Sequence, residues 1–154
     1  LFQEKQTPNH IIRDMVDFYR VPVFELNRIK NGEDYVTPEG KVIPNSRLTT
    51  PAATPRKYVY CSDTRFNANN VQYTRDADLL FHEATFAEAE RHRCKATLHS
   101  TASDAANIAK KANVKQLIIG HYSARYADLN PLLDEARAIF PNTKLSTDGS
   151  KFSW

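Results

Sequence analysis

Five acidic or imidazole residues stand where short apolar runs of the sequence end or where a helix is expected to begin. Asp63, the pair His82 and Glu83, and His121 each follow a short apolar run, and His99 precedes a helical pattern. Imidazole and carboxylate groups are good zinc ligands, and histidine moves protons near neutral pH. These residue types therefore suit a metal site, a proton-transfer site, or both.

Each of these residues also has a purely structural explanation. Asp63 could accept hydrogen bonds from the backbone amides of a turn, and Glu83 could be an acidic residue favoured at a helix N-terminus. Ser100 or Thr101 could cap a helix, with Asp104 close to the position that completes a capping box. The histidines could be buried and hydrogen-bonded. Taken singly, every structural explanation is the simpler one, and only the joint placement at successive element ends favours a site.

The elements that must position these residues alternate between strands and helices after Lys57. Short apolar runs predict strands near 58–61, 78–81, 116–119 and 144–147. Apolar residues at helical spacing predict helices near 84–93, 100–112 and 130–140. This alternation favours an α/β layered domain, in which the strand ends meet along one edge of the sheet. The candidate residues are expected to converge at that edge although they are far apart in the sequence.

The first 57 residues differ in composition and pattern, since they contain six of the eight prolines and no alternation of apolar and polar residues typical of strands. Apolar residues at helical spacing predict a helix over 8–19, and a second helical turn is expected at 23–29. Turn signals bound a hairpin or loop at 33–43, and 46–55 is expected to be a linker or an extended edge. We therefore expect a lead-in segment at 1–57 and an α/β domain at 58–154.

Composition limits the classes of protein that need to be considered. The chain has 154 residues, 41% hydrophobic and 25% charged, which suits one globular domain. Its net charge of +3 permits a polyanionic partner without requiring one. The only two cysteines, Cys61 and Cys94, form no disulfide framework, which favours the cytoplasm, and no run of about 18 apolar residues predicts a membrane span. Because the chain opens at Leu1 rather than Met, we expect a fragment.

Four segments together resemble ribonuclease Z, the tRNA 3′-processing endonucleases of the metallo-β-lactamase superfamily. They are YCSDT at 60–64, LLFHEATF at 79–86, HST at 99–101 and GHYSARY at 120–126, in the order and at the spacing of that family. The resemblance extends over about 57–149. It implies the C-terminal half of an αββα sandwich, with one mainly β sheet and helices on its outer face.

The resemblance also implies roles in metal binding and catalysis. Asp63 is similar to the aspartate that bridges two zinc ions, and His121 to the last histidine ligand of the second zinc. His99 resembles the histidine that assists proton transfer near the scissile phosphate, with Glu83 as its orienting partner. These roles suit the chemistry, because two zinc ions can generate hydroxide and stabilise both oxygens of an in-line phosphoryl displacement.

Substrate contacts are implied in the same way. Arg125 resembles a residue beside the acceptor-end phosphates of tRNA, with Ser123 and Thr85 nearby. A planar, permanently charged guanidinium is well suited to phosphate. Precursor tRNA is therefore the expected partner.

The H-x-H-x-D-H motif of this family is absent, since no two of the five histidines are separated by a single residue. Two ligands are too few for a tight zinc site. We therefore expect the isolated chain to bind zinc poorly and to be inactive. Its apolar strands need cover on both faces, so association with an N-terminal half or with a second copy, as a homodimer, is expected. A different hydrolase of the same superfamily and a non-catalytic scaffold that binds RNA or protein remain alternatives.

Overall fold

A computed structural model describes all 154 residues and divides the chain into two compact units. The first unit contains Leu1–Gln3 and Arg56–Trp154, and the second contains Glu4–Pro55. The candidate site residues all lie in the first unit. Each unit has a hydrophobic cluster of its own.

The first unit is built on a five-stranded sheet in the order β1-β6-β7-β8-β9. The central strands β6 (Lys57–Cys61), β7 (Leu79–Glu83) and β8 (Gln116–Gly120), with the edge strand β9 (Thr143–Leu145), run parallel, and β1 (Phe2–Gln3) adds an antiparallel edge. Each of the four strands predicted from the apolar runs is present, and β1 was not predicted. Parallel strands bring their carboxyl ends to one edge of the sheet. The candidate residues lie at that edge, because they come at or just after the strand ends.

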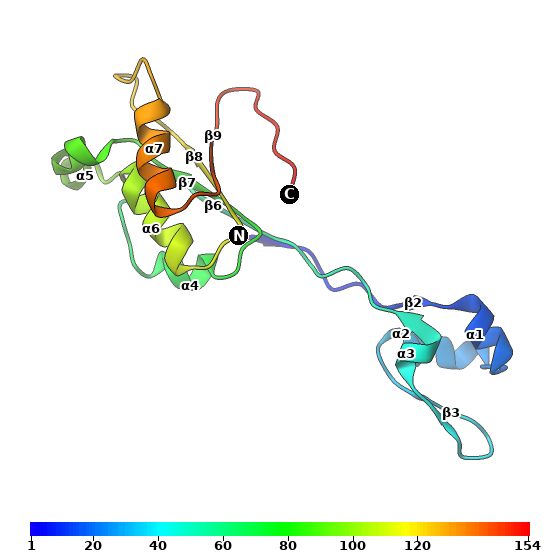
Figure 1. Cartoon of the computed structure of the whole chain (residues 1–154). Helices are drawn as coiled ribbons and strands as arrows, with labels where there is room; N and C mark the ends of the chain where they lie inside the picture. Colours follow the sequence, from blue (N-terminus) through cyan, green and yellow to red (C-terminus); the bar gives the residue numbers. More distant parts are fainter. The chain divides into compact units, whose positions relative to one another are not determined.

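Two helices pack against the same sheet as the connections between parallel strands. Helix α6 (Ala102–Lys111) leads to β8, and helix α7 (Asn130–Ile139) leads to β9; both lie on one side of the strands in Figure 1. The shorter elements α4 (Asn70–Thr74), η2 (Glu88–Glu90) and α5 (Arg91–Thr97) complete this unit. The helix predicted at 84–93 begins later, because 84–87 are used for hydrogen bonds to the neighbouring segments at Gly120, Ser100 and Tyr126.

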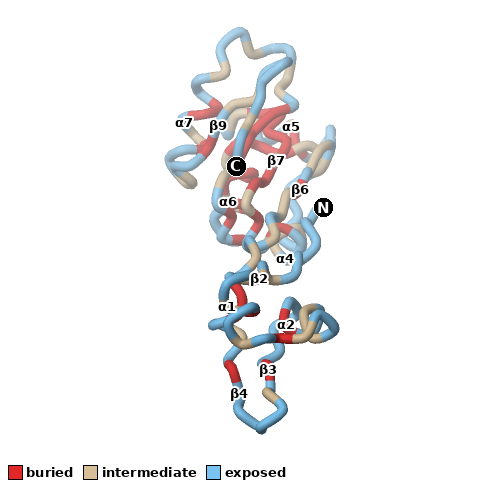
Figure 2. Tube along the Cα trace, turned by 90° about the vertical axis from the view of Figure 1, so that its right-hand side faces the viewer, coloured by how far each residue is buried: buried red, intermediate tan, exposed pale blue.

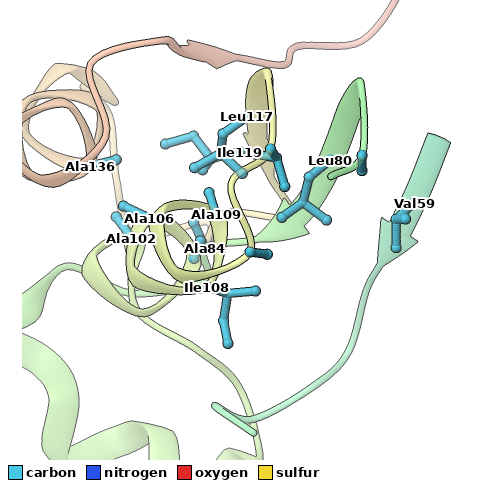
Figure 3. Packing of buried hydrophobic residues seen from close by; sticks show 14 of the residues in the cluster. Val59, Leu80, Ala84, Ala102, Ala106, Ile108, Ala109, Leu117, Ile119 and Ala136 are labelled. Atoms are coloured by element: carbon cyan, nitrogen blue, oxygen red, sulfur yellow. The ribbon is translucent and has the colours of Figure 1, made fainter. Parts of the chain in front are cut away.

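The main core lies between the sheet and α6. Leu80, Leu117 and Ile119 are completely buried against the helix, which presents Ala106 and Ala109 to them (Figure 3). Small side chains allow the helix backbone to approach the sheet closely. In Figure 2 the buried residues of this unit, drawn in red, gather along the central strands and α6.

The opposite face of the sheet is only partly covered. The strand alternation places Tyr60, Phe81 and Ile118 in one row across three strands on that face. Ile118 is buried, but Tyr60 is 53% exposed and its ring stacks on that of Phe81 at 4.7 Å between centroids. The expected bare apolar face is therefore reduced to an aromatic surface at the β6 side.

The second unit is a small helical unit with two short antiparallel pairs. It contains β2 (His10–Ile11), α1 (Arg13–Phe18), η1 (Val23–Glu25), α2 (Leu26–Lys30), β3 (Tyr35–Val36), β4 (Val42–Ile43), α3 (Asn45–Leu48) and β5 (Thr49–Thr50). The helix predicted at 8–19 begins only at Arg13, because the preceding residues pair with β5. The hairpin alternative at 33–43 is confirmed by the β3–β4 pair. Val16, Ile29 and Leu48 form the centre of its hydrophobic cluster.

Candidate metal and proton-transfer site

The carboxyl edge of the sheet brings together four of the residues singled out in the sequence. Asp63 follows β6, Glu83 is the last residue of β7, and His121 directly follows β8. His99 comes from the segment between α5 and α6, and Phe86 and Thr101 beside it form a parallel bridge. The predicted convergence at the sheet edge is therefore present in the structure.

Backbone geometry at two of these positions is unusual. Asp63 has φ of 49° and His121 has φ of 60°, both in the left-handed region that most residues with side chains avoid. Asp and His are among the residues that enter this region most often, and such conformations cluster at functional sites. The chain thus turns sharply at Asp63, two residues after β6, and at His121, directly after β8.

Gly120 directly precedes the second of these turns, at a position with no room for a side chain. A Cβ added at this position would lie 2.7 Å from the ring of Phe81 and closer still to the hydroxyl of Ser146. No side chain fits there without movement of its neighbours. The glycine therefore lets β8 lie close to its surroundings up to the residue before His121.

Asp63, His99 and His121 form a cluster of possible metal ligands. One ligand atom from each lies within 4.8 Å of those of the other two. The Nε2 atom of His121 is 3.1 Å from a carboxylate oxygen of Asp63, and the rings of His99 and His121 are 5.2 Å apart between centroids. One carboxylate and two imidazoles are a donor set that zinc accepts. The residue types in the sequence allowed either role for His99, and the family resemblance implied proton transfer, whereas the structure also places His99 among the possible ligands.

Glu83 is the polar centre beneath this cluster. Its side chain has no exposure, and its Oε1 atom accepts a hydrogen bond from the backbone N–H of Thr64 and lies 2.9 Å from Nδ1 of His99. The Oε2 atom accepts from the hydroxyl of Thr85 at 2.6 Å and from the backbone N–H of Ser100 at 3.1 Å. A buried carboxylate is stable only with such partners. The suggestion that Glu83 is a helix N-terminal charge is thus wrong, because it ends a strand and binds donors from three segments.

Thr85 connects this carboxylate to the second imidazole. Its hydroxyl lies 2.6 Å from Glu83 Oε2, 2.9 Å from the carbonyl oxygen of His121 and 3.1 Å from Nδ1 of His121. The single hydroxyl hydrogen has two oxygen acceptors, so the hydroxyl oxygen is free to accept from Nδ1–H of His121. Thr85 is buried and these contacts are internal, whereas the family resemblance implied a position near the substrate.

Both histidines are consequently oriented in the same way. Each has Nδ1 at a hydrogen-bond partner inside the protein, Glu83 for His99 and Thr85 for His121. Nε2 is thus the ring nitrogen left for the cluster, and that of His121 lies 3.1 Å from Asp63. Protein groups that bind the second ring nitrogen of a metal-ligating histidine fix its tautomer and its ring orientation. The arrangement is therefore suited to metal binding through Nε2, to proton donation through Nε2, or to one of each.

The helix-cap explanation for the HST segment is also confirmed. The hydroxyl of Thr101 accepts from the backbone N–H of Asp104 while the Asp104 carboxylate accepts from the backbone N–H of Thr101, which is a capping box at the start of α6. Arg91 donates to the same carboxylate at 2.8 Å. Capping and site function thus belong to different residues, since Thr101 anchors the helix and His99 faces the cluster.

His82 lies outside the cluster. It is completely buried, its Nδ1 atom is 2.8 Å from the carbonyl oxygen of Glu83, and its Nε2 atom has no hydrogen-bond partner. Burial lowers the pKa of its imidazole, and the hydrogen bond to the Glu83 carbonyl only partly offsets this effect. The structural explanation is the one that holds for His82.

The segment after His121 carries the two remaining residues expected to contact substrate. Ser123 donates its backbone N–H to the carbonyl oxygen of Thr85 at 3.1 Å, which fixes the segment beside the cluster. The hydroxyl of Tyr126 accepts from Ala87 and donates to Glu90 at 2.8 Å each. Arg125 lies exposed between these two anchor points. The hydrogen bond from Tyr126 is the largest cause of the lowered pKa of the Glu90 carboxyl, and the side chain of Arg125 is close enough to lower that pKa further.

Structural comparison places the fold in a known class. The metallo-β-lactamase-fold protein YhfI from Bacillus subtilis matches 77% of this chain and 46% of its own, with a TM-score of 0.56 at 20% sequence identity. A long-form RNase Z from yeast matches 58% of this chain and 12% of its own, with a TM-score of 0.51 at 31% identity. The chain therefore has a metallo-β-lactamase-type fold, matched over part of that fold as expected from the sequence.

Sequence comparison gives the particular family. A ribonuclease Z from Bacteroides thetaiotaomicron is 65% identical over 148 residues, which are 96% of this chain and 47% of that protein. The chain belongs to the ribonuclease Z family, and it spans about half the length of the relatives it matches. No protein-family model matches it. Separately, the structure contains no helix that is long and apolar enough to cross a bilayer.

Proposed function

We propose that this chain supplies part of the active site of a zinc-dependent endoribonuclease that removes the 3′ trailer from precursor tRNA. The observation that supports this best is the cluster of Asp63, His99 and His121, in which both imidazoles have Nδ1 engaged inside the protein and Nε2 of His121 lies 3.1 Å from the Asp63 carboxylate. Asp63 and His121 would hold metal. Zinc bound there would supply a hydroxide nucleophile at neutral pH and stabilise charge on the phosphate.

His99 has the proton-transfer role in this proposal. Hydrolysis that leaves a 3′-hydroxyl on the tRNA requires one proton on the departing 3′-oxygen. Nε2 of His99 can donate that proton, because the buried carboxylate at Nδ1 holds the ring in one orientation. Glu83 is therefore a positioning residue, which acts through His99 and does not touch the substrate.

Arg125 and Ser123 would contact the substrate. Arg125 is exposed and lies two residues after Ser123, whose backbone N–H donates to the carbonyl oxygen of Thr85. A guanidinium can bind two oxygens of one phosphate in its plane. Thr85 acts from beneath by orienting His121.

The site within this chain is incomplete for a two-zinc mechanism. Its cluster offers three donor residues, and one of them is reserved here for proton transfer. Further ligands must come from an N-terminal half or from another chain, so the chain alone is proposed to bind zinc poorly and to be inactive. The exposed ring of Tyr60 and the aromatic face around it support association, including a homodimer. Light scattering that finds a stable monomer at tens of micromolar would contradict this association.

The two free cysteines are consistent with a cytoplasmic enzyme. The experiment that tests the function uses a protein in which this chain is preceded by the segment that its relatives have before it. Incubation with a precursor tRNA should release the trailer and leave a 3′-hydroxyl on the tRNA and a 5′-phosphate on the trailer. Cleavage of a small ester but not of precursor tRNA would favour a different hydrolase of the superfamily. Binding of tRNA without any cleavage would favour a scaffold.

A further inference from the structure

A cavity of about 270 Å³ opens beside His99 and is lined by Arg65, Phe66, Arg91, Cys94, Lys95, His99 and Asp104. Asp63 and His121 do not line it, although both lie close to His99 in the metal cluster. His99 is thus shared between two neighbouring regions, the ligand cluster and this cavity. The roles proposed above do not use the cavity.

Two of the cations that line the cavity are free to bind an anion. The guanidinium of Arg91 is already paired with Glu88 and with Asp104, which lies 2.8 Å away, so these charges offset one another. The side chains of Arg65 and Lys95 are exposed and form no ion pair in the structure. The cavity therefore has a local excess of positive charge that suits a phosphate group.

An aromatic ring lies next to these cations. Phe66 is 38% exposed although it is large and apolar, and the ammonium group of Lys111 lies 5.9 Å from its ring centroid. Exposed aromatic rings beside basic residues are the usual means by which proteins stack an unpaired base and hold its backbone. The volume is just below the range typical of sites for larger organic ligands, which suits one nucleotide.

We propose that this cavity binds the nucleotide whose 3′-oxygen leaves during cleavage, which is the last nucleotide of the product tRNA. Its base stacks on Phe66, and its 5′-phosphate lies between Arg65 and Lys95. We assign the nucleotide before the scissile phosphate, and not the one after it, because His99 lines the cavity and gives its proton to that 3′-oxygen. In the reaction water loses one proton to solvent and its oxygen bonds to phosphorus, the bond from phosphorus to the 3′-oxygen breaks, and a proton from His99 completes the 3′-hydroxyl. His99 then regains a proton from solvent, so that one water is consumed overall. This subsite rests on the proposed function, because it takes its substrate from that reaction.

The test combines protein variants with a modified substrate. In the protein that carries the preceding segment, Phe66→Leu should raise KM for precursor tRNA about 5- to 100-fold, as expected for loss of one stacked base, with little change in kcat. Phe66→Tyr keeps the ring and should restore KM. Arg65→Gln should also raise KM. Tyr73→Leu and Arg75→Gln are matched controls, since both residues are exposed in the same unit and neither lines the cavity.

An abasic residue in the substrate locates the base that is bound. Placed just before the scissile phosphate, it should raise KM for the unaltered protein and add nothing further in Phe66→Leu, because the two changes remove the same contact. When the abasic residue is placed just after the scissile phosphate, its effect on KM should multiply with that of Phe66→Leu, because the two changes remove different contacts. Independent effects at the first position, or equal behaviour of Arg65→Gln and Arg75→Gln, would overturn the subsite. Failure of the unaltered protein to cleave would instead overturn the proposed function.

Discussion

The Oε1 atom of Glu83 lies 2.9 Å from Nδ1 of His99, and the Glu83 side chain has no exposure to solvent. A carboxylate in this position fixes which imidazole nitrogen carries hydrogen and how the ring is oriented. The same carboxylate also accepts a hydrogen bond from the hydroxyl of Thr85, and this hydroxyl contacts the imidazole of His121. One buried group thereby orients both histidines of the cluster.

The first prediction concerns this carboxylate. Glu83→Gln keeps the size of the side chain but removes its charge. It also replaces one of the two carboxylate oxygens, both of which accept hydrogen bonds, with an amide NH2 group that can only donate. We expect kcat for precursor cleavage to fall on the order of 10- to 100-fold with a smaller change in KM. Asp134→Asn, which removes an exposed carboxylate of α7, is the control and should have no effect. A kcat for Glu83→Gln equal to that of this control would show that Glu83 does not position His99.

The second prediction concerns the hydroxyl that links the two histidines. Thr85→Val keeps the branched shape and removes the hydroxyl that lies 3.1 Å from Nδ1 of His121. Zinc affinity should fall about 10- to 100-fold, the usual effect of losing a group that orients a metal ligand. Thr85→Ser keeps the hydroxyl and should retain most of the affinity. Equal zinc affinities for Thr85→Val and the unaltered protein, measured by competition with a chelating dye, would contradict this role.

The sheet and the position of the site at its edge could be predicted from the sequence because apolar strands and polar strand ends are local patterns. The four parallel strands and the convergence of Asp63, Glu83, His99 and His121 follow from such patterns. Other features depend on contacts between distant residues and leave no local signal. The internal role of Thr85 is one example, because it arises only when β7 and β8 lie side by side.

The start of α1 shows the same limit. Helical spacing of apolar residues continues back to Ile11, but His10 and Ile11 pair with Thr50 and Thr49, nearly 40 residues later. Strand pairing at that distance overrides local spacing. The cavity beside His99 was not predicted for a similar reason, since Arg65 and Lys95 meet there from two separate segments.

The third prediction concerns stability at acidic pH. Burial lowers the pKa of His82 in the folded chain below its ordinary value of 6.5. Above that value the imidazole is neutral in both states, and as the pH falls through it the unfolded chain binds a proton that the folded chain resists. Stability should therefore decline as the pH falls below about 6.5, until the lowered pKa of the folded state is reached.

Variants at two histidines test this assignment. His82→Gln should reduce the decline in the free energy of unfolding between pH 6.5 and 5, whatever its effect at pH 7.5. His92→Gln, at an exposed histidine of α5, should leave the decline unchanged. Denaturant unfolding at several pH values provides the measurement. A decline of the same size in both variants would mean that His82 is not its source.

The most direct test of the proposed enzyme measures zinc content and precursor cleavage in the same preparations of a protein that includes the preceding segment. Asp63→Ala and His121→Ala should both lose zinc and cleavage, because these residues are the proposed ligands of this chain. His99→Ala should keep most of the zinc while kcat falls about 10²- to 10⁴-fold, as expected for loss of a proton-transfer group. Loss of metal from His99→Ala as complete as that from His121→Ala would instead make His99 a ligand. Full cleavage by Asp63→Ala and His121→Ala would contradict a metal-dependent site at this edge of the sheet.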